Sequence, residues 1–258
     1  MHENTGCIFR MKAVKGYISE VFGSFQGEGP YLGERHVFVR LCGCNLECAY
    51  CDTADARSRQ PMARLDVGRG MGDISVPNPL PVERVVEAVL AQEERPGFNA
   101  ALTLTGGEPL MQPGFIHALL AALDGRFRVI LETNGTLTRA FGAVRPLVDV
   151  VSMDIKLPSV GGQGPLWGRH TGFIKACGGK ELIVKAVVSE DTPEGEVERA
   201  ARLVAGLAPD ALLVLQPLTR AKGRAVSSGS LDIFYRAAMR HLRHVRVIPQ
   251  THKHMGVR

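Results

Sequence analysis

The sequence lacks any long hydrophobic run, because no stretch approaches the roughly 18 consecutive apolar residues that a membrane helix needs. The N-terminus also lacks a charged segment followed by an apolar segment and a small-residue cleavage site. We therefore expect no membrane association, no secretory signal and a cytoplasmic location. Tandem repeats and low-complexity tracts are absent too, so one domain spanning residues 1–258 is expected.

The sequence has little excess charge of either sign. Its formal net charge is +5 over 258 residues, with 45% hydrophobic and 22% charged residues. This composition excludes disordered and fibrous classes, and the charge is too small to indicate nucleic-acid binding. An anionic small substrate explains the positive bias equally well.

Strand-like and helix-like segments alternate along most of the chain. Strands are expected at 14–21, 36–41, 101–105, 129–133, 147–153, 182–188, 212–217 and 244–250. Helices are expected at 83–94, 113–123, 193–207 and 231–242. This alternation predicts an α/β fold with a parallel sheet, curved into a full or partial barrel.

Residues 55–81 differ from the rest of the chain. They are rich in glycine, proline and arginine and show no apolar periodicity. The sequence predicts an inserted surface loop here, mobile unless a partner covers it.

Polar residues and glycines follow several of the expected strands. Gly106-Gly107-Glu108-Pro109 comes after one strand, and Asn134-Gly135 and Asp154-Ile155-Lys156 come after the next two. Ligands of such folds bind at the carboxyl ends of the strands, so an active site is expected at this rim.

Four of the six cysteines fall within residues 42–51. Disulfides are not expected in the cytoplasm, so this clustering indicates a metal or cluster site. Cys44, Cys48 and Cys51 have the spacing CxxxCxxC, which suits three ligands of a 4Fe–4S cluster and leaves one iron open. A structural zinc site that adds Cys42 is the alternative, although Cys42 lies at a strand end, where core packing is favoured. Cys7 and Cys177 are expected to be unligated.

The motif CxxxCxxC with Tyr50 before its last cysteine, together with Gly106-Gly107-Glu108-Pro109, resembles the radical S-adenosylmethionine (SAM) enzymes. The resemblance implies that SAM chelates the open iron and that one electron releases methionine and a 5′-deoxyadenosyl radical. It also implies an electron donor such as flavodoxin or ferredoxin.

Further motifs narrow the resemblance to the 7-carboxy-7-deazaguanine synthases. They are Phe25-Gln26-Gly27-Glu28-Gly29, Phe38-Val39-Arg40, Cys44-Asn45-Leu46, Cys51-Asp52-Thr53, Glu132-Thr133-Asn134-Gly135, Gln216-Pro217 and Gln250-Thr251-His252-Lys253. This family implies a partial (open) TIM-like barrel, a homodimer, and Mg²⁺ as a further cofactor. Its reaction converts 6-carboxy-5,6,7,8-tetrahydropterin to 7-carboxy-7-deazaguanine, a queuosine-type precursor, by hydrogen abstraction at C6, ring contraction and loss of ammonia.

The resemblance assigns residues to three sets besides the cluster cysteines. The SAM contacts are Tyr50, Asp52, Gly107, Asp154, Lys156, Gln216, Pro217, Leu218 and Thr219. The substrate contacts are Phe25, Gln26, Gly27, Glu28, Arg40, Thr105, His252 and the terminal carboxylate of Arg258. The Mg²⁺ contact is Thr53. The chemistry of Arg40 agrees, because a guanidinium binds a carboxylate through two parallel hydrogen bonds.

Several polar residues also have plain structural interpretations. Without the resemblance, a helix N-cap or a loop hydroxyl is favoured for Thr53. Glu108 can also be interpreted as a loop acid that caps a helix, and Glu132 as an ordinary strand-end charge. His170, His241, His244 and His254 are interpreted as solvated or capping residues.

Two rival functions share part of this pattern. A glycyl-radical activating enzyme would carry CxxxCxxC and the glycine-rich rim, but has no reason to carry the QGEG loop or the terminal QTHK. A zinc-stabilised binding module would need the cysteines alone. The complete motif set therefore favours the pterin enzyme.

Overall fold

A computed structural model describes residues 14–68, 70–219 and 225–257 of the protein. A curved sheet forms its centre, with the strand order β12-β11-β10-β9-β8-β7-β3-β2-β4-β5. Neighbouring strands from β12 to β3 in this order run parallel, and β2 then pairs antiparallel with β3. The described part of the chain leaves β12 and β5 unpaired with each other, so the barrel is open. The predicted α/β fold with an open TIM-like barrel is confirmed.

The strands have the following bounds: β1 (Lys15–Gly16), β2 (Ile18–Phe25), β3 (Arg35–Leu41), β4 (Met62–Asp66), β5 (Asp73–Pro77), β6 (Leu80–Pro81), β7 (Ala101–Gly106), β8 (Val129–Thr133), β9 (Val150–Ile155), β10 (Glu181–Val188), β11 (Leu212–Pro217) and β12 (Val245–Val247). β1 and β6 form a separate two-stranded sheet.

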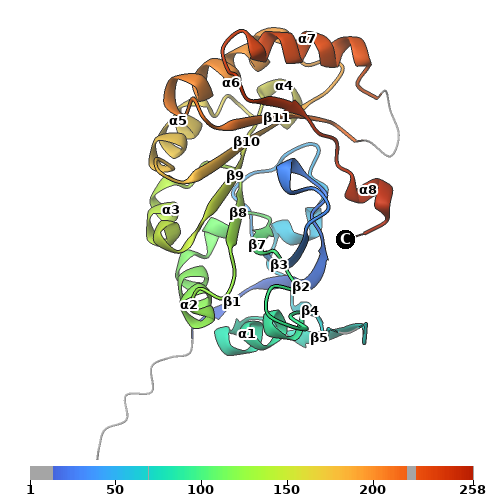
Figure 1. Ribbon diagram of the computed structural model, residues 1–258. Coiled ribbons are helices and arrows are strands. Elements are labelled where there is room, and N and C mark those ends of the chain that lie inside the picture. Colours follow the sequence, from blue (N-terminus) through green and yellow to red (C-terminus); the bar gives the residue numbers. More distant parts are fainter. Residues whose placement is uncertain (1–13, 69, 220–224, 258) are drawn as a thin grey trace, which may run out of the picture.

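The α-helices have the following bounds: α1 (Val82–Ala91), α2 (Pro113–Leu123), α3 (Thr138–Val144), α4 (Pro158–Gly161), α5 (Trp167–Ala176), α6 (Glu194–Leu207), α7 (Ser228–Met239) and α8 (His252–Met255). Short 3-10 helices are η1 (Gly29–Tyr31), η2 (Ala54–Arg57), η3 (Pro109–Met111) and η4 (Arg145–Leu147). Figure 1 shows α2, α3, α5, α6 and α7 along the convex side of the sheet, which leaves its concave side open. Within the described residues, no helix is long and apolar enough to cross a membrane.

Strand alternation gives the sheet two chemically different faces. In β7, Leu102 and Leu104 belong to the main hydrophobic core, whereas Thr105 lines a cavity on the other face. In β3, Val37 and Val39 pack in the same core, and Arg40 lines the cavity. Successive strand residues point to opposite faces, so one short segment supplies both the core and the site.

The inserted segment differs from its prediction. Residues 55–81 are not an irregular loop, because β4 pairs parallel with β2 and β5 pairs antiparallel with β4, which extends the central sheet. Ala63 and Leu65 of β4 are buried and alternate with Met62 and Arg64. This period of two covers only five residues, and the surrounding glycines and prolines obscured it.

The other expected elements are present with shifted ends. The strand expected at 147–153 begins at Val150, because η4 precedes it. Helices α3 and α5 were not predicted, and α5 is short and contains two glycines. The helix expected at 193–207 forms as α6, with Pro193 at its N-cap and Glu194 and Glu196 in its first turn.

Candidate active site

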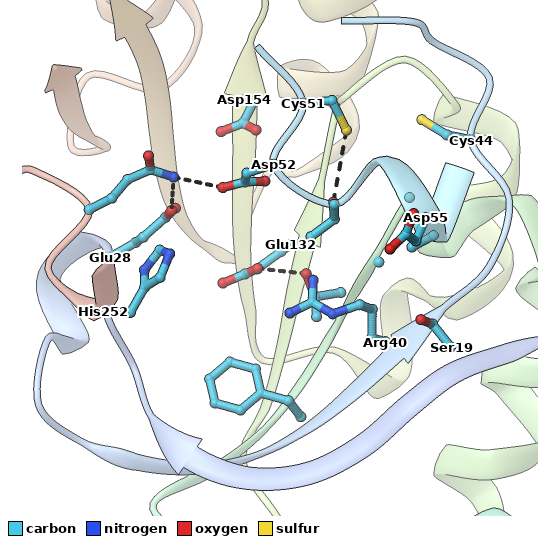
Figure 2. A pocket seen from close by; sticks show the side chains of 18 of the residues that line it. Ser19, Glu28, Arg40, Cys44, Cys51, Asp52, Asp55, Glu132, Asp154 and His252 are labelled. Atoms are coloured by element: carbon cyan, nitrogen blue, oxygen red, sulfur yellow. Dashed lines mark hydrogen bonds between the residues drawn. The ribbon is translucent and has the colours of Figure 1, made fainter. Parts of the chain in front are cut away.

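A cavity of about 1000 Å³ opens on the concave face of the sheet, at the carboxyl ends of the parallel strands. Figure 2 shows side chains from widely separated parts of the chain converging on it, including Cys44, Arg40, Glu28 and His252. Ligand pockets typically measure about 300–1000 Å³, so this one has room for more than one small ligand. Its lining includes the predicted residues Phe25, Gln26, Gly27, Glu28, Arg40, Cys44, Cys48, Tyr50, Cys51, Asp52, Thr53, Thr105, Gly107, Asp154, Lys156, Gln216, Leu218 and His252.

The thiols of Cys44, Cys48 and Cys51 all line this cavity, on a loop that follows β3. Cys42 is 2% exposed and packs in the protein interior, outside the cavity lining. Three accessible thiols on one loop fit a 4Fe–4S cluster with an open iron, whereas a four-cysteine zinc site would need Cys42 as well. The loop is therefore suited to the cluster of radical SAM enzymes.

Two groups of hydrogen bonds hold the cysteine loop in place. Backbone amides of Gly43 and Cys44 donate to the carbonyls of Ala56 (2.8 Å) and Arg57 (3.0 Å) in η2. On its other side, the side-chain Nδ2 of Asn134 donates to Oδ1 of Asn45 (2.9 Å). The inserted segment and the rim of β8 thus support the loop from opposite sides.

Burial raises the pKa of the Cys44 and Cys48 thiols above the ordinary value. The Nε2 of Gln163 lies 3.2 Å from Sγ of Cys48 and donates a hydrogen bond to it. Metal ligands are thiolates, so cluster assembly must release the protons that these thiols carry in the metal-free protein.

The Gly106-Gly107-Glu108-Pro109 rim packs directly on the end of β3 and the cysteine loop. A Cβ at Gly106 would lie 2.1 Å from the carbonyl oxygen of Leu41, and a Cβ at Gly107 would lie 2.4 Å from that of Gly43. Both positions therefore require glycine, because only a residue without a side chain permits this approach.

Glu108 links this glycine-rich segment to the end of β8. Its carboxylate accepts hydrogen bonds from Leu110 N (3.0 Å), Thr133 Oγ1 (2.9 Å) and Asn134 N (2.7 Å). Complete burial raises the pKa of Glu108 to about 7, although these donors oppose the shift. The bond from Leu110 caps η3 and confirms the predicted capping role.

A line of buried and half-buried charges crosses the floor of the cavity. Nζ of Lys156 lies 2.7 Å from Asp154, and Nζ of Lys185 lies 3.5 Å from Asp154 and 2.7 Å from Glu28. Burial by itself lowers the pKa of both lysines and raises that of both acids. The opposite charges outweigh it, so the lysine pKa values lie well above their ordinary value and the acid pKa values below theirs. All four groups are charged at neutral pH.

The C-terminal segment closes one side of the cavity against the QGEG loop. Nε2 of Gln250 donates to Glu28 (2.8 Å) and to Asp52 (2.9 Å), and Thr251 N donates to the carbonyl of Gly27 (2.9 Å). A Cβ at Gly27 would lie 2.4 Å from that of His252. The absence of a side chain at Gly27 therefore admits the C-terminal segment.

Arg40 is fixed on the opposite wall. Its Nε donates to Oε1 of Glu20 at 2.8 Å, and its guanidinium lies 5.8 Å from the ring centroid of Phe22. Beside it, Oγ1 of Thr105 donates to Glu132 (2.8 Å), which also accepts from Gln26 (3.1 Å). Glu132 lies next to the last residue of β8, and its hydrogen bonds to Thr105 and Gln26 make it part of the cavity wall rather than an ordinary strand-end charge.

The hydroxyl of Thr53 is available to a ligand. Thr53 occupies the N-cap position of η2, but its side chain makes no capping hydrogen bond. Its Oγ1 lies 4.0 Å from Sγ of Cys51, and the residue lines the cavity. The side chain thus does not act as an N-cap, and of the two structural interpretations only the loop hydroxyl agrees with the structure.

Some sequence predictions fall outside this arrangement. Pro217 and Thr219 are not part of the cavity lining, because strand alternation presents Gln216 and Leu218 instead. Arg258 and Cys7 lie outside the described residues. His170 is 0% exposed, so it is not a solvated residue.

Sequence reasoning missed Lys185 and Glu20. Lys185 is the only charged residue within the apolar segment LIVKAVV of β10, and this isolated charge was the available signal. Glu20 lies among apolar and small residues of β2 and carries the same kind of signal. A charge on a strand that is otherwise apolar is buried only with a partner.

The comparisons with known proteins agree with the geometry of the site. A profile of the radical SAM superfamily matches residues 39–160. A 7-carboxy-7-deazaguanine synthase from Geobacter sulfurreducens is 39% identical over 245 residues, which cover 93% of this chain and 96% of that protein. The synthase of the same name from Thermococcus kodakarensis is 36% identical, over 93% of this chain and 98% of that protein.

Solved structures show the same fold. QueE from Escherichia coli has a TM-score of 0.62 at 22% identity, covering 92% of this chain and 95% of that one. A radical SAM methyltransferase from Sphaerobacter thermophilus has a TM-score of 0.58 at 13% identity, over 90% of this chain and 77% of that one. On the sequence relatives, the chain belongs to the 7-carboxy-7-deazaguanine synthase family of the radical SAM superfamily.

Proposed function

We propose that this protein is a radical SAM lyase that converts 6-carboxy-5,6,7,8-tetrahydropterin to 7-carboxy-7-deazaguanine in the biosynthesis of queuosine-type nucleosides. One observation carries the proposal: the cysteine loop, Arg40, the QGEG loop and the C-terminal segment all line one cavity. The chain is also similar over nearly its whole length to synthases of this name. A glycyl-radical activating enzyme has no need of the QGEG loop or the C-terminal segment, and no feature of the cavity favours that function.

Cys44, Cys48 and Cys51 hold the 4Fe–4S cluster in this proposal. A cluster held by these thiolates, with SAM beside it, would supply the radical chemistry for abstraction of the hydrogen atom at C6 of the substrate. The product differs from the substrate by the elements of ammonia alone, so the reaction needs no net oxidant or reductant.

The residues proposed for SAM surround the cluster loop. Lys156 and Asp154 form a largely buried ion pair at the carboxyl end of β9, and Nζ of Lys156 lies over the ring of Tyr50, 5.3 Å from its centroid. Oε1 of Gln216 is buried without a hydrogen-bond partner in the described structure, so it offers an acceptor to a ligand. Gly107 exposes backbone at the same rim, and Asp52 and Leu218 complete the proposed set.

The residues proposed for the pterin are on the other side of the cavity. Arg40 binds the substrate carboxylate, because its guanidinium is held in a fixed orientation by Glu20 and Phe22. Glu28 stays ionised beside Lys185 and accepts from the N–H groups of the pterin ring. Phe25, Gln26, Thr105 and His252 complete the wall around the ring.

Mg²⁺ would bind at Thr53 and the substrate carboxylate. A single protein ligand suffices, because Mg²⁺ keeps several waters and takes oxygen atoms from its substrate. Support comes from the Thr53 hydroxyl, which lines the cavity and makes no capping bond.

The remaining partners are carried over from the family. They are a low-potential electron donor such as flavodoxin or ferredoxin and a second copy of the chain in a homodimer. A cytoplasmic location agrees with thiols that must stay reduced to bind iron. Nucleic acid is not a partner in this proposal, since the carboxylates of substrate and cofactor account for the positive charge.

The experiment that tests the function is anaerobic reconstitution with iron and sulfide, followed by incubation with the carboxypterin, SAM, dithionite and Mg²⁺. We expect 7-carboxy-7-deazaguanine as the product, identified by its mass and ultraviolet spectrum. An intact cluster without this product would indicate another radical SAM reaction. A colourless protein with one zinc and no iron would indicate a zinc-stabilised module.

A further inference from the structure

The inserted strand β4 contributes a charged residue to the row that holds Arg40. Glu20 of β2 lies opposite Arg40 of the neighbouring strand β3 and opposite Arg64 of β4, the neighbour on the other side. Side chains at facing positions of neighbouring strands lie on the same face of a sheet. All three residues line the cavity, in the order Arg64, Glu20, Arg40 across the sheet.

Glu20 divides its two oxygens between the two arginines. Oε1 accepts from Nε of Arg40 at 2.8 Å, and Oε2 accepts from Nη2 of Arg64 at 2.6 Å. The side chain of Glu20 is only 9% exposed, so both oxygens depend on these partners rather than on water.

This division leaves the end of the Arg40 guanidinium free. Within the described residues, Nε is the only atom of this side chain that donates a hydrogen bond. Its two terminal nitrogens can therefore donate in parallel to one carboxylate, which is the geometry that gives guanidinium its selectivity for carboxylates.

We propose that Arg64 is a positioning residue for the substrate carboxylate: it occupies the second oxygen of Glu20 and so keeps the terminal nitrogens of Arg40 available. This inference rests on the proposed function, since it concerns the carboxylate of the pterin. Without Arg64, Oε2 of Glu20 is free to accept a hydrogen bond from a terminal nitrogen of Arg40, which makes the Glu20–Arg40 ion pair bidentate. The substrate then has to compete with Glu20 for that nitrogen.

Exposure separates this role from a structural one. The side chain of Arg64 is 57% exposed, against 17% for Arg40. Ion pairs of exposed arginines contribute little to folding stability. Loss of the Arg64 side chain should therefore change ligand selection and leave the fold intact.

The test compares two fluorescent probes, 6-carboxypterin and unsubstituted pterin, titrated into the reconstituted protein in the presence of SAM. Wild type should bind the carboxylated probe more tightly. Arg64→Gln should weaken 6-carboxypterin binding about tenfold, the effect of one charge-assisted hydrogen bond, and leave pterin binding unchanged. Arg64→Lys should restore part of the preference. Arg84→Gln, which removes another exposed arginine paired with a glutamate, is the matched control and should bind both probes as wild type does.

A double-mutant cycle shows whether Arg64 acts through Glu20. In a Glu20→Gln background, Arg64→Gln should cause no further loss of 6-carboxypterin binding. A further tenfold loss would mean that Arg64 contacts the ligand directly, and equal binding of 6-carboxypterin by wild type and Arg64→Gln would also overturn the inference. If neither probe binds to wild type, the proposed function itself fails, which is a different result from retained binding that ignores Arg64.

Discussion

Nζ of Lys185 lies 2.7 Å from the carboxylate of Glu28, in the interior of the barrel. The pair joins β10 to the QGEG loop, and the same ammonium lies 3.5 Å from Asp154, next to the proposed SAM site. One buried cation thus connects the residues proposed for the two ligands.

Replacement of Lys185 by methionine should be severely damaging. Glu28 and Asp154 would remain as buried carboxylates with less positive charge near them, and removal of one partner of a buried pair costs about 3–5 kcal/mol. We expect a loss of that order in the free energy of unfolding, measured by urea denaturation, and at least tenfold weaker binding of 6-carboxypterin. Lys185→Arg keeps the charge and should lose less of both. Wild-type stability and affinity in Lys185→Met would contradict this account of the ion pairs.

The pair should be insensitive to pH in the neutral range. The pKa of Glu28 lies below its ordinary value of 4.5 and that of Lys185 lies well above 10.5. A carboxylate with a lowered pKa contributes stability above its unfolded pKa and loses it only as the pH falls through the folded value. Any pH dependence near neutrality must therefore come from another group.

Glu108 is one such group. Burial raises its pKa to about 7, so folding favours the protonated form. The contribution of Glu108 to the free energy of unfolding is fully present below its unfolded pKa. As the pH rises to 7 this contribution, up to about 3 kcal/mol, is lost. We expect the free energy of unfolding of the cluster-free wild type, minus that of Glu108→Gln, to fall between pH 5 and pH 8. A difference that stays constant over this range would show that Glu108 is already ionised at pH 5.

The three cavity cysteines and Cys42 should behave differently on replacement by alanine. Cys44→Ala, Cys48→Ala or Cys51→Ala should abolish both the iron–sulfur content and turnover, because each thiol lines the cavity. Cys42→Ala should keep the cluster and lose only about 1 kcal/mol of stability from a small core vacancy. Iron and sulfide analysis with electron paramagnetic resonance of the reduced protein provides the measurement. An intact cluster in any of the first three variants, or its loss in Cys42→Ala, would mean that different thiols bind the iron.

Thr53 should determine the Mg²⁺ requirement. Thr53→Val keeps the shape of the side chain but removes the hydroxyl, and should raise the Mg²⁺ concentration for half-maximal activity by about tenfold. Thr53→Ser should retain the wild-type requirement. An unchanged Mg²⁺ dependence in Thr53→Val would exclude this residue as the ligand.

Much of the site was predictable because it follows strand ends in a regular α/β alternation. The cysteine loop, Gly107, Asp154 and Gln216 each come directly after a strand or at its end, and all line the cavity. The residues that were missed reach the cavity from strand interiors. Strand alternation places Lys185 and Glu20 on the face of the sheet that lines the cavity, but which face is left open depends on the strand order, which no local pattern shows.

The inserted segment was harder to predict for a related reason. Among the described residues, β5 pairs only with β4 at the edge of the sheet, and it is largely exposed, so it carries almost no buried apolar pattern. The segment joins the central sheet through the pairing of β4 with β2, and β2 is more than 30 residues earlier in the chain. The partner of a strand is not visible in its local sequence, and this long-range pairing is what brings Arg64 beside Glu20.

The proposed reaction loses ammonia with no net redox change, and its stoichiometry tests this most directly. The reconstituted enzyme is to be incubated with excess carboxypterin and a limiting amount of SAM, and product, ammonia, methionine and 5′-deoxyadenosine are to be quantified over many turnovers. The account predicts equal amounts of 7-carboxy-7-deazaguanine and ammonia, far exceeding the SAM that is lost. One methionine and one 5′-deoxyadenosine formed for every product would contradict it.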